Sequence, residues 1–476
     1  MILQLEFKKN LYVNVLTVGG YTYSTQVISF LSSIVISRLL LPSDYGFFAL
    51  ITVFTGFVGI FTNAGFGAAV IRSNYNTTYY KALRNLSLLM GVVIFTIMLL
   101  LAYPIAWFYR NSSLVLPIVV FSLVFIFRPL SIVPSAILRK NLNFSYIGKR
   151  DLLSSLISVL ITIIMAYLNC SYWSLIIPQI FVAILNFYFL ELKVGLGYKI
   201  YPWQYTIVGY KKTKKLIGSV LGFDTINYWA RNADNLIIGK WYGAEELGIY
   251  NRAYSLLTLP LNIVSGIFGS VLLPSLTKLK RSGGDINKEY EGVLNIISLL
   301  DFPIAFVLIV FPKQLVSFLW GPNWIAVAEL LPYFGLLLLT QGLITTIGNI
   351  YYLLGKEKTN FYVGAVNAVI LVLGIVIGAF YSIVDVARVY ALVYLSFNVP
   401  INLYFGFVKS FGFDWKFIIV FWVPKVLLSL VILFLLWNKL DYYIPFVLMI
   451  YGITIVLKVL EEIKVTIRFF VKKILS

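Results

Sequence analysis

Runs of about 20 mostly apolar residues follow one another along almost the whole of this chain. A helix needs a stretch of that length to cross the hydrocarbon core of a membrane. Hydrophobic residues make up 60% of the 476 residues and charged residues only 12%, well below the roughly 25% of soluble domains. The runs are continuous and do not alternate with polar residues, which favours helices over barrel strands. We therefore predict an all-α polytopic membrane protein.

Fourteen membrane spans account for the distribution of the basic residues. With the N-terminus inside, 28 of the 38 Lys and Arg residues fall in the tails and loops of one side and six in the loops of the other. This asymmetry follows the positive-inside rule and predicts that both termini are cytoplasmic. The six outer residues are Arg38, Arg110, Lys240, Lys313, Arg388 and Lys439. The predicted spans are 13–36, 46–70, 86–108, 114–136, 152–170, 173–192, 216–238, 247–272, 291–312, 326–352, 361–381, 386–408, 417–437 and 442–465.

Two stretches that lie 202 residues apart have one pattern in common. Residues 36–48 are ISRLLLPSDYGFF and residues 238–250 are IGKWYGAEELGIY, so that Gly46 corresponds to Gly248. A parallel repeat in a very apolar chain is typical of a two-lobed membrane transporter that handles its substrate between the lobes.

The repeat and the spans together predict four segments. We expect two pseudo-symmetric six-helix lobes around a central cavity, joined by a basic segment at the cytoplasmic surface and followed by two extra helices. The N-terminal lobe covers 1–195, the connector 196–215, the C-terminal lobe 216–410, and the extra helices with a basic cytoplasmic tail 411–476.

The seventh span holds the densest set of polar residues at membrane depth. These residues fall on one helix face, within an arc of about 100°, and Trp229 lies on the opposite face. Subtracting the repeat offset places each of them on a Thr or Ser of the first span. Because polar groups in hydrocarbon must face protein, water or a partner, we expect both faces to line an aqueous cavity. The set is Asp224, Asn227, Arg231, Asp234 and Asn235, and its counterparts are Thr22, Thr25, Ser29, Ser32 and Ser33.

Four further charges lie near or within membrane depth. Asp301 in span 9 comes just before Pro303, which frees a backbone carbonyl and weakens the helix. This position makes Asp301 a candidate site for a coupling ion or a proton. The others are Arg128 in span 4, Arg252 in span 8 and Lys425 in span 13.

Structural roles compete with functional ones at these positions. Arg231 and Asp234, at i and i+3, could simply neutralise each other on a buried face. Arg252 could extend its charged end to the membrane interface, and Lys425 is equally open to either reading.

Composition also excludes several classes of site. The chain has no histidine and a single cysteine, Cys170, so the commonest general base and the usual Cys- and His-based metal sites are absent. We expect no catalytic residue, no metal and no cofactor. The net charge of +19 follows from topology and from attraction to anionic membrane lipids, and it does not require nucleic acid as a partner.

Two blocks of sequence carry a family resemblance. Residues 227–260, NYWARNADNLIIGKWYGAEELGIYNRAYSLLTLP, and residues 37–57, SRLLLPSDYGFFALITVFTGF, resemble the polysaccharide-exporting branch of the multidrug, oligosaccharidyl-lipid and polysaccharide exporter superfamily. Its members are the Wzx-type flippases of bacterial O-antigen, capsule and exopolysaccharide assembly. The resemblance extends over roughly 1–410 and fades over the last two spans.

The resemblance implies a function as well as a fold. The cargo would be an oligosaccharide repeat unit linked through pyrophosphate to undecaprenol, moved across the bacterial inner membrane by alternating access and driven by an ion or proton gradient. Cavity residues that would bind it are Arg128, Arg231, Asn227, Asn235, Arg252, Ser29 and Thr25, and those that would couple to the ion are Asp234, Asp301 and Asp224. A glycan polymerase and a chain-length regulator are implied partners.

Two other functions stay open from the sequence. An exporter of drugs or of another lipid-linked precursor, from the same superfamily, would share the fold. A membrane glycosyltransferase or polymerase usually needs a sizeable loop with acidic catalytic residues, whereas the longest loops here, near 196–215 and 273–290, are basic.

Overall fold

The protein is helical wherever its structure is described. The computed structural model describes residues 2–63, 65–72, 77–196, 228–229, 231–453 and 455–456, together with 204, 207 and 225. These residues form helices, turns and short connections without a strand. Ten helices among them are long and apolar enough to cross a membrane, and they coincide with ten of the predicted spans. The predicted all-α, multi-pass membrane architecture is confirmed, whereas the total of fourteen spans stays a prediction.

The other predicted spans fall on helices of a different character. They correspond to α1 (Ile2–Leu39), to helical residues 231–241, to α10 (Gly243–Arg281) and to a shorter apolar helix, Asp441–Ile453. Polar side chains interrupt the first three of these helices. In α1 the same polar residues that suggested a functional role therefore weaken the hydropathy signal.

The helices divide into two compact units, Met1–Gly248 and Ile249–Ser476. The division lies within α10, whereas the sequence predicted a boundary at the connector 196–215. Apart from Leu196 and the single residues 204 and 207, that connector lies outside the described residues. Helical residues 231–241 belong to the first unit. The predicted four-segment organisation stays a prediction.

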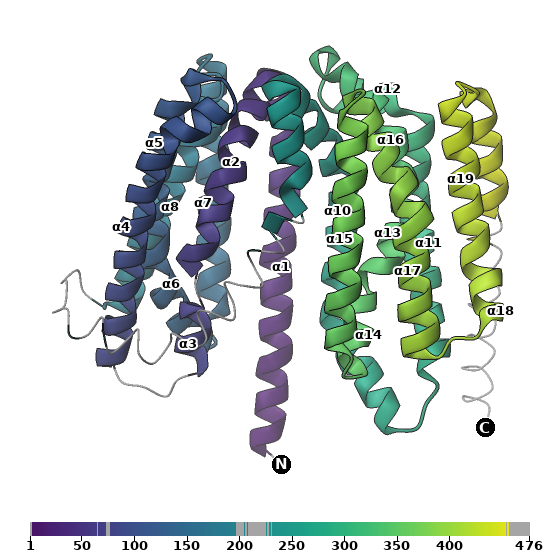
Figure 1. The fold of residues 1–476 in the computed structure, drawn as a ribbon. Coiled ribbons are helices and arrows are strands. Elements are labelled where there is room, and N and C mark those ends of the chain that lie inside the picture. The colour runs from purple at the N-terminus through teal and green to yellow at the C-terminus, as the bar shows by residue number, and fades with distance from the viewer. Residues whose placement is uncertain are drawn as a thin grey trace. The chain divides into compact units, whose positions relative to one another are not determined.

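Figure 1 shows the helices of each unit running side by side along a common direction. In the first unit α1 packs on α7, and α6 packs on both α4 and α8. Its helices, besides α1, are α2 (Pro42–Asn63), α3 (Phe66–Arg72), α4 (Thr77–Phe108), α5 (Val115–Ser122), α6 (Val124–Lys140), α7 (Phe144–Tyr167) and α8 (Trp173–Val194).

In the second unit α11 packs on α13, and α15 packs on α16. Short π-helical turns flank Pro400, which lacks the N–H that a regular α-helix needs at that position. The helices of this unit after α10 are α11 (Ile286–Val310), α12 (Pro312–Leu319), α13 (Leu331–Thr345), α14 (Ile347–Leu353), α15 (Glu357–Ala379), α16 (Ile383–Val393), α17 (Val399–Asn402), α18 (Trp415–Phe417) and α19 (Val423–Trp437).

Local sequence sets several helix ends. The Asn143 side chain accepts a hydrogen bond from the Tyr146 N–H and caps α7, and Asp285 accepts two from the first turn of α11. Gly195 ends α8 with φ of 66°, a left-handed conformation that glycine adopts without strain. These ends fix where the polar residues of each helix lie along its length.

The repeat-related glycines lie against each other's helices within the first unit. A Cβ atom on Gly46 of α2 would lie 1.5 Å from the Ala244 carbonyl oxygen, and one on Gly248 would lie 2.0 Å from the Pro42 carbonyl oxygen. No side chain fits at such distances, because both obstacles are backbone atoms. The two glycines therefore let the first turns of α2 and α10 approach to backbone contact.

We predict that Gly46→Ala lowers the unfolding temperature of the purified protein. The added methyl group must displace backbone, and overpacking of this kind costs about 1–3 kcal/mol. Gly20→Ala is the matched control, because a Cβ on Gly20 has no neighbour within 4 Å. The unfolding temperatures of the two variants are measured in detergent. Equal stability of the two variants would contradict the close contact at Gly46.

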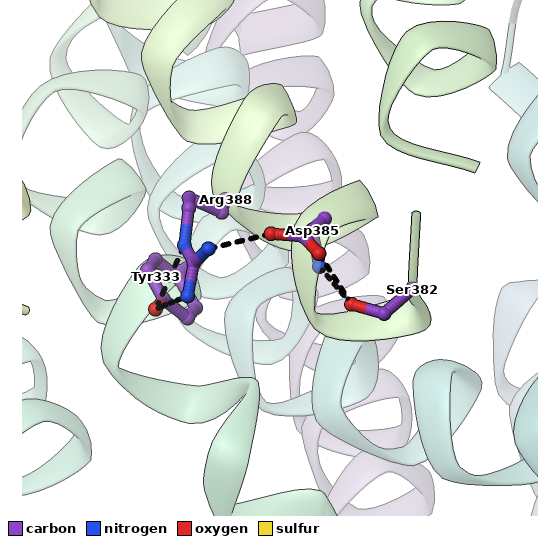
Figure 2. A network of polar contacts seen from close by, with 4 residues as sticks. All are labelled: Tyr333, Ser382, Asp385 and Arg388. Carbon is purple, nitrogen blue, oxygen red and sulfur yellow. Dashed lines mark hydrogen bonds and ion pairs between the residues drawn. The ribbon is translucent and has the colours of Figure 1, made fainter. Parts of the chain in front are cut away.

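A polar network joins α13 and α16 of the second unit (Figure 2). Ser382 caps α16 by accepting from the Asp385 N–H at 3.0 Å, and its hydroxyl donates to the Asp385 carboxylate at 2.6 Å. Arg388 pairs with that carboxylate and donates to the Tyr333 hydroxyl of α13 at 3.2 and 3.3 Å. Its guanidinium also lies 4.8 Å from the ring centroid of Trp437 on α19. Arg388, which we counted with the outer loops although it lies at the start of the predicted span 386–408, is within α16 and joins α13, α16 and α19.

Arg388→Gln is expected to destabilise this end of the second unit. The substitution removes the ion pair and the cation–π contact, and we expect a loss of about 1–3 kcal/mol. Lys439→Gln serves as the control, since Lys439 is exposed and sits in the neighbouring connection. The stability of the two variants is compared by the denaturant concentration at which each is half unfolded. An Arg388→Gln variant as stable as the control would rule out a structural role for Arg388.

Candidate functional site

A polar cavity of about 250 Å³ opens between three helices of the first unit. Arg128 contributes from α6, Arg150 from α7, and Gln179 and Asn186 from α8. Two guanidinium groups and two amides thus share one space within the helical bundle. The remaining lining residues are Ser131, Ile132, Ser135, Val182, Ala183 and Leu190.

Helical spacing explains why these side chains meet. On α6, Arg128, Ser131 and Ser135 follow the i, i+3, i+7 pattern of a single face. On α8, Gln179 and Asn186 follow the same pattern at i and i+7. Since α6 packs directly on α8, the two polar faces enclose the cavity.

Hydrogen bonds hold part of the cavity wall in place. The Gln179 Oε1 atom lies 3.5 Å from Nη2 of Arg128, at the limit of a hydrogen bond. Arg150 pairs with Asp151, and Ser154 donates to the Asn186 Oδ1 atom at 3.0 Å. The Arg128 side chain is exposed and makes no ion pair with any residue in the described ranges. Its charge is available to an anionic ligand.

The seventh predicted span presents its polar residues differently from the cavity helices. Trp229 packs on Phe54 and Phe57 of α2 with ring centroids 6.3 and 5.0 Å apart, which matches the apolar face expected for it. Tyr228 donates to the Val53 carbonyl of α2 at 2.6 Å. This anchor explains why helical residues 231–241 belong to the first unit. Asp224 and Asn227 lie outside the described residues.

Arg231 is exposed, whereas Asp234 is buried. No ion pair joins the two within the part of the chain that the structure covers, so mutual neutralisation is not what holds this face together. The Asp234 carboxylate instead accepts from the Asn235 N–H at 2.8 Å. The Asn235 Oδ1 atom is buried with no hydrogen-bond partner among the described residues. Arg231 is thus, like Arg128, an exposed cation that makes no ion pair in the described ranges.

The hydroxyl groups of α1 are largely satisfied by their own helix. Thr25 donates to the Tyr21 carbonyl at 2.8 Å, and Ser32 donates to the Ser29 carbonyl at 3.0 Å. The Ser29 side chain is exposed, and Thr25 is half-buried. These residues keep α1 polar on one side without adding a charge.

Two predicted cations of the second unit lie against aromatic rings. The Arg252 guanidinium of α10 lies 5.4 Å from the ring centroid of Trp320 and 5.5 Å from that of Trp324. Lys425 of α19 donates to the Phe421 carbonyl at 2.9 Å and lies 3.4 Å from the ring centroid of Phe421. Both charges lie against aromatic rings, and no such contact is described for Arg128 or Arg231.

Asp301 lies deep within the second unit, with 2% of its surface exposed. Its carboxylate faces Gly342 on α13, and neither of its oxygens has a hydrogen-bond partner among the described residues. Asp301 therefore does not share a site with Arg252 or Lys425 through any hydrogen bond or ion pair that the structure describes.

Sequence reasoning missed most of the α6–α7–α8 cavity. It identified Arg128 but not Arg150, Gln179, Asn186 or the two serines. The signal was present, because polar residues at i, i+3 and i+7 in an apolar span mark a polar face. Only the packing of α6 on α8 shows that the two polar faces meet.

Known proteins with similar sequences are named for glycan biosynthesis. Teichuronic acid biosynthesis protein TuaB of Bacillus subtilis (strain 168) is 25% identical over 350 residues, which cover 71% of this chain and 70% of TuaB. Lipopolysaccharide biosynthesis protein WzxC of Escherichia coli (strain K12) is 24% identical over 319 residues, covering 66% of this chain and 63% of WzxC.

Solved structures with a similar fold are transporters. The lipid II flippase MurJ in an inward closed conformation superimposes with a TM-score of 0.69 at 16% identity, over 96% of this chain and 99% of MurJ. An inward-facing multidrug resistance transporter of the MATE family superimposes with a TM-score of 0.62 at 12% identity. The match covers 81% of this chain and 93% of the transporter chain. The chain therefore shares the helical fold of these two structures.

The family model described as "Polysaccharide biosynthesis protein" matches residues 35–329, more than half of the chain. This range includes both repeated blocks, the α6–α7–α8 cavity and Asp301. The predicted family resemblance is confirmed, and the chain belongs to the family of polysaccharide biosynthesis proteins.

Proposed function

We propose that this protein is a flippase that moves an undecaprenyl-pyrophosphate-linked oligosaccharide repeat unit from the inner to the outer leaflet of the bacterial cytoplasmic membrane. It works by alternating access, as a secondary-active antiporter, in the assembly of O-antigen, capsule or exopolysaccharide. Both termini are cytoplasmic. The observation that carries the proposal is the cationic, amide-lined cavity of the first unit in a member of this family.

The chemistry of that cavity suits the head group of such a lipid. Pyrophosphate and sugar hydroxyls cannot cross about 30 Å of hydrocarbon unaided. A guanidinium stays protonated and binds phosphate oxygens through two parallel hydrogen bonds. In this proposal Arg128 takes that role, whereas Arg150 lines the same cavity while paired with Asp151. The amides of Gln179 and Asn186 can both donate to and accept from sugar hydroxyls.

The other predicted residues take supporting roles in the same proposal. Arg231 and Asn235 supply an exposed cation and an unsatisfied amide oxygen for the moving head group. Asn227, Ser29, Thr25 and Arg252 complete the proposed binding set, and Asp224, Asp234 and Asp301 the coupling set. A glycan polymerase and a chain-length regulator are the proposed partners that receive the product.

The relatives support a glycan cargo over a drug. TuaB and WzxC are named for teichuronic acid and lipopolysaccharide biosynthesis, and MurJ for flipping lipid II. Because the fold also resembles that of a multidrug resistance transporter of the MATE family, drug export is the second candidate function. Two assays separate the functions. A drug exporter should expel a cationic dye from cells, whereas a glycan flippase should restore surface glycan to a strain that lacks its own flippase.

We predict that Arg128→Ala reduces surface glycan about tenfold to hundredfold in the rescued strain. Losing charge-assisted hydrogen bonds to phosphate costs about 1.5–3 kcal/mol, and each 1.4 kcal/mol is about tenfold. Arg139→Ala on the same helix is the matched control, because Arg139 is exposed and lies outside the cavity. Glycan is measured by immunoblot at equal amounts of membrane protein. Full display in the Arg128→Ala variant would remove the cavity from the proposal.

Arg231→Ala is expected to impair export without changing the unfolding temperature. Its side chain is exposed and makes no ion pair in the described ranges, so little native contact is lost. Asp234→Ala should impair export and also lower the unfolding temperature, because Asp234 is buried and accepts a hydrogen bond from a neighbouring N–H. Thermal unfolding and glycan display, measured on both variants, test the contrast. A destabilised Arg231→Ala variant would reassign Arg231 to a structural role.

A further inference from the structure

Asp301 occupies an apolar niche between two closely packed helices. It lies near the middle of α11, which packs on α13. Both of its carboxyl oxygens are buried and lack a hydrogen-bond partner in the described part of the chain. The surrounding turns of α13 contribute buried leucines, Leu338, Leu339 and Leu343.

Gly342 makes room for this carboxyl group. A Cβ atom on Gly342 would lie 1.7 Å from Oδ2 of Asp301 and 2.8 Å from its Cγ. The side chain of Asp301 therefore fills the space that any other residue at position 342 would take. The niche is a fitted arrangement of an acid and a glycine on facing helices.

No described charge compensates Asp301. The elements that contact α11 carry a few titratable groups, and none of these hydrogen-bonds to or forms an ion pair with Asp301 within the described ranges. The groups are Tyr333 on α13, Lys313 on α12, Tyr451 on the helix whose ring meets Phe302, and Lys288, Glu289, Tyr290 and Glu291 at the start of α11 itself.

An isolated carboxylate that is buried without a hydrogen-bond partner is costly, and a bound cation would offset that cost. A metal cation would need several oxygen ligands, and the described residues hold no cluster of three or more acidic, Cys or His side chains. A proton needs only one carboxyl oxygen, and we therefore take the proton as the cation for this niche.

We propose that Asp301 is the proton-binding site through which this protein is driven, protonated while α11 and α13 are closed over it and ionised when they separate. The inference deepens the proposed flippase function and rests on it. On opening, the carboxyl O–H bond breaks, the electron pair stays on oxygen and the proton passes to water. Ser298, one turn away on α11 and also buried without a described partner, can then donate to the carboxylate. Pro303 removes a backbone hydrogen bond of α11 and gives the helix a place to bend.

The first test detects the proton without any glycan. Dicyclohexylcarbodiimide reacts with protonated carboxyl groups in apolar surroundings, and peptide mass spectrometry locates the adduct. On the purified full-length protein we expect labelling of Asp301 at neutral pH, where exposed aspartates are ionised, and its decline as the pH rises. Asp301→Asn should lose the adduct, and Asp441→Asn, an exposed control, should keep it. Absence of the adduct from Asp301 at every pH overturns the inference.

The second test asks whether the proton drives transport. In the rescued strain, the Asp301→Asn variant should lose the sensitivity of glycan display to a protonophore, together with most of the display itself. Gly342→Ala should reproduce the loss by displacing the carboxyl group, whereas Gly364→Ala, whose Cβ has no neighbour within 4 Å, should not. Display in the Asp301→Asn variant that equals the parent and remains sensitive to the protonophore overturns the inference but leaves the flippase function intact. Failure of the parent protein to rescue the strain refutes the proposed function instead.

Discussion

Polar groups at bilayer depth have no water to bind, and the structure shows how many of them are satisfied within the protein. Hydroxyl groups such as that of Thr25 bond to carbonyls of their own helix. The hydroxyl of Tyr228 bonds to a carbonyl of α2, and this contact holds the start of the second repeat in the first unit. Arg252 and Lys425 lie against aromatic rings. The folding of each unit depends on this matching, because an unsatisfied group in hydrocarbon costs several kcal/mol.

Glycines provide the space that these contacts need. Gly56 of α2 leaves room for the Tyr228 hydroxyl, and Gly342 leaves room for the Asp301 carboxyl. Gly46 and Gly248 bring the backbones of α2 and α10 together. In a membrane the driving force between helices is close packing and not the hydrophobic effect. Small residues therefore decide where helices meet, and in this chain they also decide where polar groups can be buried.

The sequence predicted the helical class, ten spans that coincide with described helices, the family, and the orientation of Trp229. Each of these follows from a one-dimensional signal such as run length, repeat or helical period. The unit division at Gly248 and the α6–α7–α8 cavity could not be predicted in the same way. Arg128 and Asn186 line the same cavity because two helix faces from separate spans pack together. The sequence of a single span does not indicate which other span it packs against. Arg252 looked the same as Arg128 in sequence, and only its tryptophan neighbours distinguish it.

Some charged residues of this protein have partners within the fold, whereas others have no ion pair among the described residues. Arg84 forms a buried ion pair with Glu191, and Arg388 is held by Asp385 and Tyr333, so their charges are used within the fold. Arg128 and Arg231 make no ion pair in the described ranges and are exposed, and both belong to the first unit. Asp301 is the buried acid of the second unit whose oxygens lack described partners. A transporter needs charges that the fold leaves unused, because only these can change partner as the cargo and the driving ion move. In the proposed flippase, Arg128 of the first unit would bind cargo and Asp301 of the second would take part in coupling, so that these two tasks fall on different helices of one chain.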